Sequence, residues 1–292
     1  MKIQTIFSPK FAANTPTPSM RKLAPVAKEA ARLGYAQLQE PDLAHSLGIV
    51  TRLNALHDPD YVAAFVSGEG RLASSNGFTW SPQIRGGVLA MNAGMLSGAR
   101  LAIAHGIAAC VSQGFHHSQP NHGGGFCTFN GLALVAKETP GRRVFVLDCD
   151  NHGGDGTAEF AKSLPNLFNY SVCGSMFGAE SHSRSVVDHV QLRGSFKPYA
   201  EALGRAFKAA AVFKPGIVLY QAGMDAHCDD PLGGANLTTE QIYERDLTVF
   251  RHFKAAGIPV LFNLAGGYST LDKVVALHVG TFKAAAEVWG AK

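Results

Sequence analysis

Paired cysteines are missing from this sequence. Its 292 residues include five cysteines, an odd number, and no Cys-x-x-Cys motif occurs. A disulfide framework and a cysteine-based zinc site are therefore disfavoured, and this usage is typical of a reducing compartment. We expect a cytoplasmic protein whose thiols are free at Cys110, Cys127, Cys149, Cys173 and Cys228.

Signals for membranes and nucleic acids are missing as well. Residues Met1–Phe7 alternate like a strand and are too short and too polar for a signal peptide. No apolar run approaches the length that crosses a bilayer. The net charge is only +4, and Arg142-Arg143 is the one adjacent arginine pair, so no basic patch favours direct nucleic-acid binding. We expect a soluble protein with neither a membrane nor a nucleic acid as its partner.

What is present is typical of a compact enzyme with many tight loops. Hydrophobic residues make up 46% of the chain, charged residues only 16%, and there are 32 glycines. No Pro/Ser-rich linker, composition shift or internal repeat divides the chain. The sequence therefore predicts a single domain over residues 1–292.

Strand and helix patterns alternate along the chain. Apolar runs predict strands at Ile3–Phe7, Ile107–Val111, Val144–Leu147, Ile217–Gln221 and Ile258–Asn263, with a weaker one at Asn169–Val172. Helical periodicity predicts helices at Arg21–Leu33, Asp60–Phe65, Gly87–Ala104, Lys197–Val212, Thr239–Ala256 and Leu271–Trp289. This alternation predicts a three-layer αβα fold, in which helices cover both faces of a mostly parallel sheet.

The segment that begins at Asp148 is the most informative. Asp148, Asp150 and His152 directly follow a buried apolar strand, and strand ends are the usual place for a site in open α/β sheets. An Asp and a His two residues apart on an extended segment point the same way. Their oxygen and nitrogen donors suit one zinc ion. The alternative interpretation is a solvated acidic turn with a capping aspartate.

Three other predicted strands also end in polar side chains. His116 and His117 follow one strand, Asp225 follows another, and Tyr268 follows the last after a Gly-Gly pair. Taken singly, these are consistent with a surface histidine pair, a helix-capping aspartate and an aromatic at the edge of the core. Their occurrence at strand ends of one sheet favours a common site.

These motifs resemble those of the zinc-dependent histone deacetylase family, within the arginase–deacetylase superfold. They occur in the family's order from about Leu56 to near the C-terminus, and the Gly123–Cys127 run is most similar to small bacterial and class IV-type members. The matching segments are Gly114–His117, Gly125–Asn130, Asp148–Gly156, Gly223–Asp225, Asp230–Gly234 and Leu264–Tyr268.

The resemblance implies roles for individual residues. It makes Asp150, His152 and Asp225 the zinc ligands. It makes His116 and His117 the active-site histidines, oriented by Asp148 and Asp155 respectively. It also implies that Tyr268 donates its hydroxyl to the substrate carbonyl, that the Gly125 carbonyl accepts the scissile N–H, that Phe126 walls the acyl-lysine channel, and that Leu232 stands near its mouth.

The resemblance also implies two kinds of metal ion. The divalent ion is zinc, although this ligand set also tolerates iron or cobalt. A structural K⁺ or Na⁺ would lie beneath it, at Asp148, Asp150, Ser171 and the backbones of His152 and Val172.

Three functions compete under this resemblance. The favoured one is hydrolysis of acylated lysine side chains in proteins or peptides by metal-activated water. The second is hydrolysis of a small acylated amine such as an acetylpolyamine, which needs carboxylates at the channel mouth; Glu180, Asp229 and Asp230 are the candidates. The third is a catalytically silent protein that binds acylated ligands. An arginase-like two-metal hydrolase is disfavoured, because His152 stands where a bridging carboxylate would be needed.

Two segments depart from the family pattern. The loop Cys173–Glu180 is divergent, and Phe177 is the candidate there for a second channel wall. The N-terminal segment Asn14–Lys22 lacks the usual His-Pro-Glu-Arg-Pro stretch, and the sequence leaves open whether Arg21 takes the place of the family's arginine. Both segments belong to the substrate entrance, so the sequence says least about what enters the site.

Overall fold

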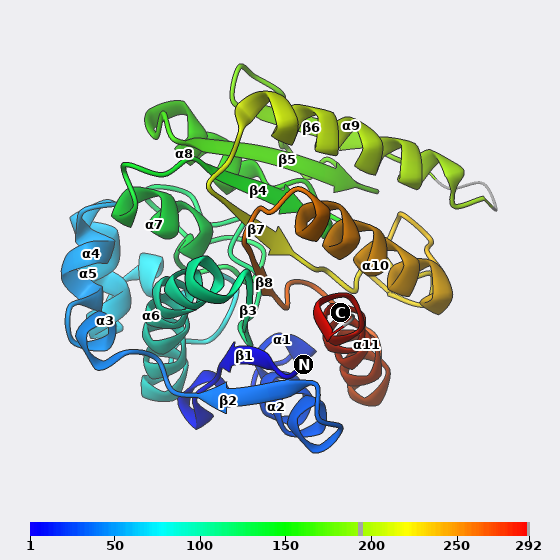
Figure 1. The fold of residues 1–292 in the computed structure, drawn as a ribbon. Coiled ribbons are helices and arrows are strands. Elements are labelled where there is room, and N and C mark those ends of the chain that lie inside the picture. The colour runs from blue at the N-terminus through cyan, green and yellow to red at the C-terminus, as the bar shows by residue number, and fades with distance from the viewer. Residues whose placement is uncertain (192–194, 291–292) are drawn as a thin grey trace.

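The computed structural model describes residues 1–191 and 195–290. In that part of the chain, eight strands form one sheet in the order β2-β1-β3-β8-β7-β4-β5-β6 (Figure 1). Every paired neighbour is parallel, which confirms the predicted parallel sheet. The strands are β1 (Ile3–Ile6), β2 (Ala36–Gln39), β3 (Ile107–Cys110), β4 (Val144–Asp148), β5 (Leu167–Cys173), β6 (Ser185–His189), β7 (Ile217–Gln221) and β8 (Val260–Asn263).

Helices cover both faces of this sheet (Figure 1), as the alternating pattern predicts. One layer holds α3 (Leu43–Leu47), α4 (Ile49–Asn54), α5 (Pro59–Ser67), α6 (Pro82–His105), α7 (Gly131–Glu138) and α8 (Asp155–Ser163). The other holds α2 (Leu23–Arg32), α9 (Lys197–Phe213), α10 (Thr239–Ala255) and α11 (Leu271–Gly290). The short α1 (Pro18–Arg21) precedes α2, and 3₁₀ turns occur at Pro9–Phe11 and Arg71–Ser74.

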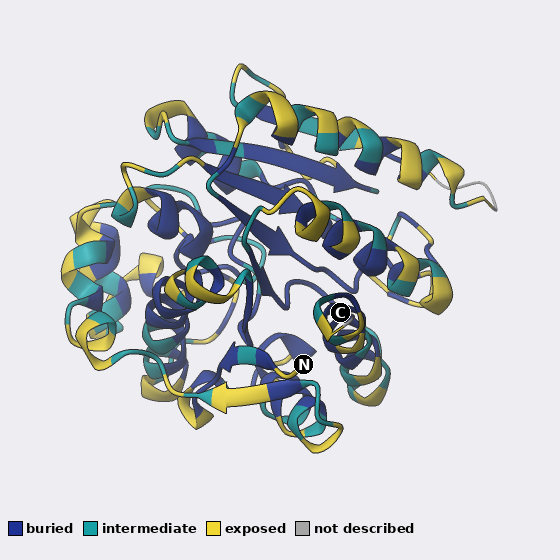
Figure 2. Ribbon diagram, viewed as in Figure 1, coloured by how far each residue is buried: buried dark blue, intermediate teal, exposed yellow. Residues whose placement is uncertain are grey.

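The core follows the centre of the sheet (Figure 2). Every residue of β3, β4, β7 and β8 is buried, because helices cover these strands on both faces. The edge strands β2 and β6 are largely exposed or half-buried. Both lack a continuous apolar run, which is why the sequence pattern did not predict them.

Helix α6 corrects one expectation. Its length and hydropathy are sufficient to cross a membrane, although 67% of its apolar window is buried inside the protein. The helix packs against β1, β3 and α7. A Cβ at Gly94 would lie 2.9 Å from the Phe11 ring, and one at Gly98 would lie 2.8 Å from Leu261. Its glycines thus let the helix approach the sheet closely, as a core helix does.

The topology brings the polar strand ends together. Strands β3, β8, β7 and β4 are consecutive neighbours, and parallel strands all end at the same edge of a sheet. The register pairs the last residue of β4, Asp148, with Gln221 of β7, and Gln221 with Asn263 of β8. The loops that follow these strands therefore meet over one edge of the sheet.

Candidate active site

Asp150, His152 and Asp225 form a compact donor cluster at this edge. One ligand atom from each residue lies within 4.8 Å of the others. The Nδ1 atom of His152 is 3.1 Å from Asp225 Oδ2 and 3.3 Å from Asp150 Oδ1. Two carboxylates and an imidazole are a donor set that suits zinc and similar divalent ions.

The electrostatics of this cluster are those of a cation site. Burial and the nearby charge of Asp150 raise the pKa of Asp225 to about 7. Burial lowers the pKa of His152, but its hydrogen bonds to Asp150 and Asp225 outweigh this effect and raise the pKa to about 10. These shifts favour a proton shared among the three groups. A divalent cation would replace that proton, because metal ligands bind in their deprotonated forms.

The backbone fixes these carboxylates in place. The Asn151 N–H donates to Asp225 Oδ1 at 2.9 Å, and the Gly266 N–H donates to Asp150 Oδ2 at 2.7 Å. A Cβ at Gly266 would lie 2.7 Å from Asp150 Oδ2 and closer still to Asp225 Oδ2. Only glycine lets the loop after β8 approach the cluster this closely.

Two His–Asp pairs lie beside the cluster. His116 Nδ1 is 2.7 Å from Asp148 Oδ2, and His117 Nδ1 is 2.6 Å from Asp155 Oδ1. The centres of the two imidazole rings are 3.9 Å apart, and both rings are buried. The turn after β3 thus brings both histidines side by side, each with a carboxylate on its Nδ1.

The two imidazoles differ in charge. Burial lowers the pKa of His116, but Asp148 and Asp150 outweigh it and raise the pKa to about 9. Burial and the charge of His116 lower the pKa of His117 to about 4, although Asp155 opposes this. At neutral pH, His116 is therefore a cation and His117 is neutral. With its Nδ1–H directed at Asp155, His117 has an unprotonated Nε2 that can accept a proton.

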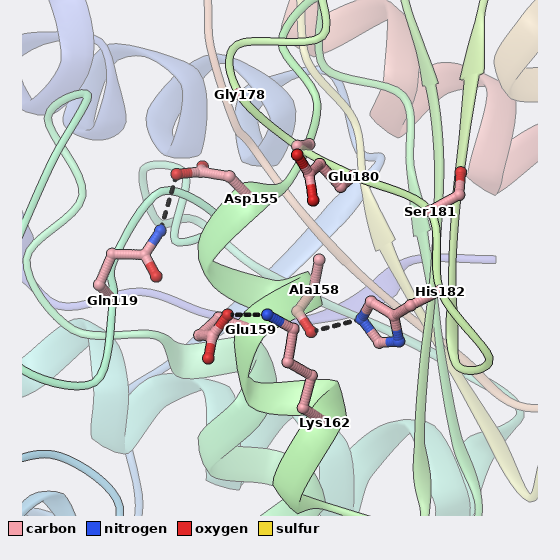
Figure 3. A pocket seen from close by; sticks show the side chains of 10 residues that line it. Gln119, Asp155, Ala158, Glu159, Lys162, Gly178, Glu180, Ser181 and His182 are labelled. Carbon is pink, nitrogen blue, oxygen red and sulfur yellow. Dashed lines mark hydrogen bonds and ion pairs between the residues drawn. The ribbon is translucent and has the colours of Figure 1, made fainter.

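Two glutamines support these carboxylates, and the sequence reasoning missed both. The Gln221 side-chain amide donates to Asp148 Oδ1 at 3.1 Å, and the Gln119 amide donates to Asp155 Oδ2 at 2.7 Å. Figure 3 shows Gln119 and Asp155 facing each other at the start of α8. Gln221 had one detectable signal, a polar residue that ends an otherwise apolar buried strand. Gln119 had none, because the fold alone brings it to Asp155.

Tyr268 closes the site on the side of β8. Its backbone N–H donates to Asp230 Oδ2 at 2.6 Å, and the Ser269 N–H donates to the same oxygen at 3.2 Å. Burial and the charges of Asp150 and Asp225 raise the pKa of its phenol. The hydroxyl therefore remains protonated and able to donate a hydrogen bond.

A small internal cavity joins these groups. Its volume is about 10 Å³. Its walls include His116, Gly125, Phe126, Asp150 and Tyr268. Substrate residues implied by the resemblance therefore share a cavity wall with a donor-cluster carboxylate and one of the histidines.

Aromatic rings flank the site on two sides. The Phe126 ring lies 5.6 Å from the Tyr268 ring, and the Phe177 ring lies 4.1 Å from the His117 ring. Both phenylalanines have a left-handed backbone conformation, with φ of 66° and 49°. Residues other than glycine rarely adopt this conformation. Strained backbone of this kind is concentrated at functional sites. Leu232 is 47% exposed, and its carbonyl accepts a hydrogen bond from Asn151, the neighbour of two cluster residues.

The comparisons with known proteins decide the family. The model of the histone deacetylase domain matches residues 21–282. The chain belongs to the histone deacetylase family. An uncharacterized protein of Picosynechococcus sp. is 30% identical over 283 residues, which cover 94% of this chain and 93% of that protein.

Other relatives match over a shorter span. Histone deacetylase 2 of Arabidopsis thaliana is 29% identical over 188 residues, and the acetoin utilization protein AcuC of Staphylococcus aureus is 29% identical over 181 residues. These alignments cover 60% and 56% of this deacetylase-family chain, and 48% and 45% of the two relatives. The chain thus matches less than half the length of either protein.

Solved structures share the fold. The acetylpolyamine aminohydrolase of Burkholderia pseudomallei superposes with a TM-score of 0.80 at 17% identity, over 98% of this chain and 99% of that one. The HDA15 HD domain superposes with a TM-score of 0.78 at 18% identity, over 99% of this chain and 90% of that one. The arginase–deacetylase fold expected from the sequence is therefore confirmed.

The N-terminal region of this deacetylase-family protein answers the question that the sequence left open about Arg21. The exposed Arg21 donates to the carbonyls of Pro16 and Thr17, outside the site. Its neighbour Lys22 is fully buried, and its Nζ donates to the carbonyls of Ala265 and Gly266. Burial lowers the pKa of Lys22 to about 8, although Asp225 and Asp150 oppose this. A buried cation thus supports the loop that carries Tyr268.

The monovalent-cation site that we expect beneath the donor cluster stays a prediction. Asp148 and Ser171 are register partners on adjacent strands. Ser171 Oγ accepts a hydrogen bond from the Gly154 N–H at 3.1 Å, and the Val172 carbonyl is 3.4 Å from the Tyr199 hydroxyl. The structure therefore brings the named residues to one region without assigning them an ion.

Proposed function

We propose that this histone deacetylase family member is a zinc-dependent deacylase that hydrolyses the amide of acylated lysine side chains in proteins or peptides. One observation carries the proposal. The donor cluster Asp150–His152–Asp225, the His116–Asp148 and His117–Asp155 pairs, and Tyr268 lie together at one edge of the sheet. Together they supply a metal ligand set, a base and a hydrogen-bond donor for amide hydrolysis.

The cluster would hold the zinc ion through Asp150, His152 and Asp225. Three protein ligands leave positions open for water and substrate, as in catalytic zinc sites. When bound, zinc acts as a Lewis acid toward the amide carbonyl and lowers the pKa of water from 15.7 toward about 7. Members of this family are generally metal-dependent, and iron or cobalt fits the same ligands.

His117 is the proposed general base. Its neutral ring accepts the proton of the attacking water at Nε2, while Asp155 orients Nδ1–H and stabilises the imidazolium that forms. The same group returns a proton to the leaving amine. Such acid–base help contributes roughly 10²–10⁴-fold. His116 lies 2.7 Å from Asp148 and 3.7 Å from Asp150.

Tyr268 and the channel residues position the substrate. The Tyr268 hydroxyl donates to the acyl oxygen as negative charge develops there, a contribution of about 3 kcal/mol for one such donor. The Gly125 carbonyl accepts the scissile N–H. Phe126 and Phe177 present flat apolar faces that fit the alkyl stem of a lysine, and Leu232 stands at the mouth.

A small acylated amine such as an acetylpolyamine is the second candidate substrate. It would need carboxylates free to bind a distant ammonium group. Asp230 is committed to the backbone of Tyr268 and Ser269, and Asp229 is 3.5 Å from Lys273 Nζ. Glu180 is exposed, and it makes no ion pair among the described residues. With one such carboxylate left of the three, the structure favours the lysine substrate.

A catalytically silent acyl-binding protein is the third alternative. Such a protein has no need of a base or of a donor to the acyl oxygen. Here His117, Asp155 and Tyr268 are all present, which supports an enzyme over a silent binding protein. The proposed partners are acylated lysines or acylated amines. The absence of nucleic-acid and membrane partners stays an expectation, as does the cytoplasmic setting.

Hydrolysis of matched fluorogenic substrates tests this proposal. Acetyl-lysine, longer acyl-lysine and acetylpolyamine substrates are compared with the zinc-loaded protein and with an Asp150→Ala control. Activity on an acyl-lysine peptide that the control lacks supports the deacylase. A preference for the polyamine assigns the small-molecule function instead. Zinc binding without any turnover contradicts both and favours the silent binding protein.

A further inference from the structure

A second group of metal-type donors lies on the loop that follows β7. His227, Cys228 and Asp229 offer a nitrogen, a sulfur and an oxygen that all lie within 4.8 Å of one another. The Cys228 sulfur is 3.8 Å from His227 Nδ1 and 3.7 Å from Asp229 Oδ1. This group shares no residue with the donor cluster of the active site, and its Cys228 and Asp229 are exposed.

The tautomer of His227 suits a metal ligand. The backbone N–H of Asp229 donates to His227 Nδ1 at 3.0 Å, so Nδ1 carries the lone pair. The proton is therefore on Nε2, which donates to Thr239 Oγ1 at 3.0 Å. Metal-ligating histidines characteristically donate their far N–H to such a partner, which fixes the ring. An ion would take the Nδ1 lone pair in place of the Asp229 N–H.

Cys228 is the thiol that is free to coordinate. The other four cysteines are buried and Cys228 is exposed. Only a thiolate binds a metal, so the exposed thiol beside an imidazole and a carboxylate is the one available.

The ammonium group of Lys273 already lies beside this second group of donors. Lys273 Nζ lies 3.5 Å from Asp229 Oδ2 and 3.4 Å from Thr239 Oγ1. This ammonium group would compete with an ion for the Asp229 carboxylate. Replacement of Lys273 therefore offers a test, because loss of the ammonium group should strengthen the binding of the ion.

We propose that His227 Nδ1, Cys228 Sγ and an Asp229 carboxylate oxygen bind one divalent transition-metal ion, with solvent completing its coordination. The thiolate and imidazole select zinc or cobalt over magnesium and calcium, which prefer oxygen ligands. The next residue, Asp230, holds the backbone of Tyr268. The loop that carries this second ion therefore also supports the active-site tyrosine.

Titration of the metal-free protein with Co²⁺ tests this site. A thiolate ligand to cobalt gives a near-ultraviolet charge-transfer band, which the active-site ligands cannot give because none of them is sulfur. We expect the band in the parent protein and its loss in Cys228→Ser. Thr239→Val should weaken the binding by roughly 10–100-fold, as expected for loss of a supporting hydrogen bond, and Lys273→Gln should tighten it. His105→Gln, an exposed histidine at the end of α6, is the matched control that should change nothing.

The two metal sites are distinguished by their spectra. The visible bands of Co²⁺ bound at the active site should disappear in Asp150→Ala and persist in Cys228→Ser. Failure of the deacylase proposal therefore leaves this test intact. No near-ultraviolet band in the parent, or a band that survives Cys228→Ser, overturns the second site. Protection of Cys228 from iodoacetamide by zinc in the parent is a measurement that needs no variant, and unprotected alkylation would also contradict the proposal.

Discussion

Replacement of Tyr268 by phenylalanine removes one oxygen from the proposed site. The Tyr268 ring lies against Phe126, and its backbone N–H is held by Asp230; neither contact involves the hydroxyl. No protein partner of the hydroxyl occurs among the described residues. The variant therefore leaves no protein group unpaired, and its stability should stay within about 0.5 kcal/mol of the parent.

The kinetic effect should be much larger. Loss of one donor to a developing negative charge costs about 2.7–4 kcal/mol, or 10²–10³-fold in kcat. The effect should appear in kcat with little change in KM, because the hydrogen bond strengthens only as charge develops. The zinc content should not change, since Tyr268 is not among the proposed ligands.

The assay is steady-state hydrolysis of an acetyl-lysine peptide, with zinc analysis and thermal unfolding of the same preparations. Tyr243→Phe is the matched control, because its hydroxyl bonds the exposed Glu287 at 2.7 Å, away from the site. The control should keep full activity. A Tyr268→Phe protein with unchanged kcat would refute the assigned role, and one that has lost its zinc would show that the residue acts on the metal site instead.

Three further expectations concern the base, the fold and the metal. Asp155→Asn should lower kcat by about 10²–10⁴-fold, because the amide no longer stabilises a His117 imidazolium; unchanged kcat on the same peptide would exclude His117 as the base. Burial lowers the pKa of His57 to about 4 from 6.5, so its neutral form stabilises the fold above pH 6.5. That stability is lost as the pH falls toward 4, by up to about 3 kcal/mol. Urea unfolding at pH 7.5 and 5.0 should show a steeper loss in the parent than in His57→Gln, and equal losses would contradict the argument. Zinc at 100 times its dissociation constant should stabilise the metal-free protein by about 2.7 kcal/mol; an equal gain in Asp150→Ala would place the ion elsewhere.

The central strands could be predicted because their burial leaves a direct trace in the sequence. β4 and β7 lie in the middle of a parallel sheet, so helices cover both faces and every position is apolar up to the final polar residue. β2 reads Ala-Gln-Leu-Gln and lies at the sheet edge, where only its first residue is buried. Its place in the sheet depends on pairing with β1, which a local pattern does not reveal.

The residues of the site also fall into two groups, those that could be predicted from the sequence and those that could not. Residues that would act on metal or substrate occur in short motifs, and the structure brings together those named from the sequence. Lys22, Gln119 and Gln221 act through other residues, by hydrogen bonds across 36 to 244 positions of the chain. Phe177 lies in a divergent loop and comes beside His117 only through the fold. Support of this kind depends on the geometry of the fold, and among these residues only Gln221 leaves a local signal, as the polar end of an otherwise apolar buried strand.

The supporting residues also explain how the site carries so much buried charge. Asp148, Asp150, Asp155 and Asp225 place four carboxylates in the donor cluster and beside the two histidines, and unpaired buried charges are strongly unfavourable. Lys22 and the cationic His116 balance two of them. The remaining two negative charges match one divalent ion, provided that His117 and His152 are neutral. Metal binding requires a neutral His152, and a general base requires a neutral His117. The charge balance of the pocket therefore supports the same assignment as its geometry, a divalent ion beside an unprotonated histidine.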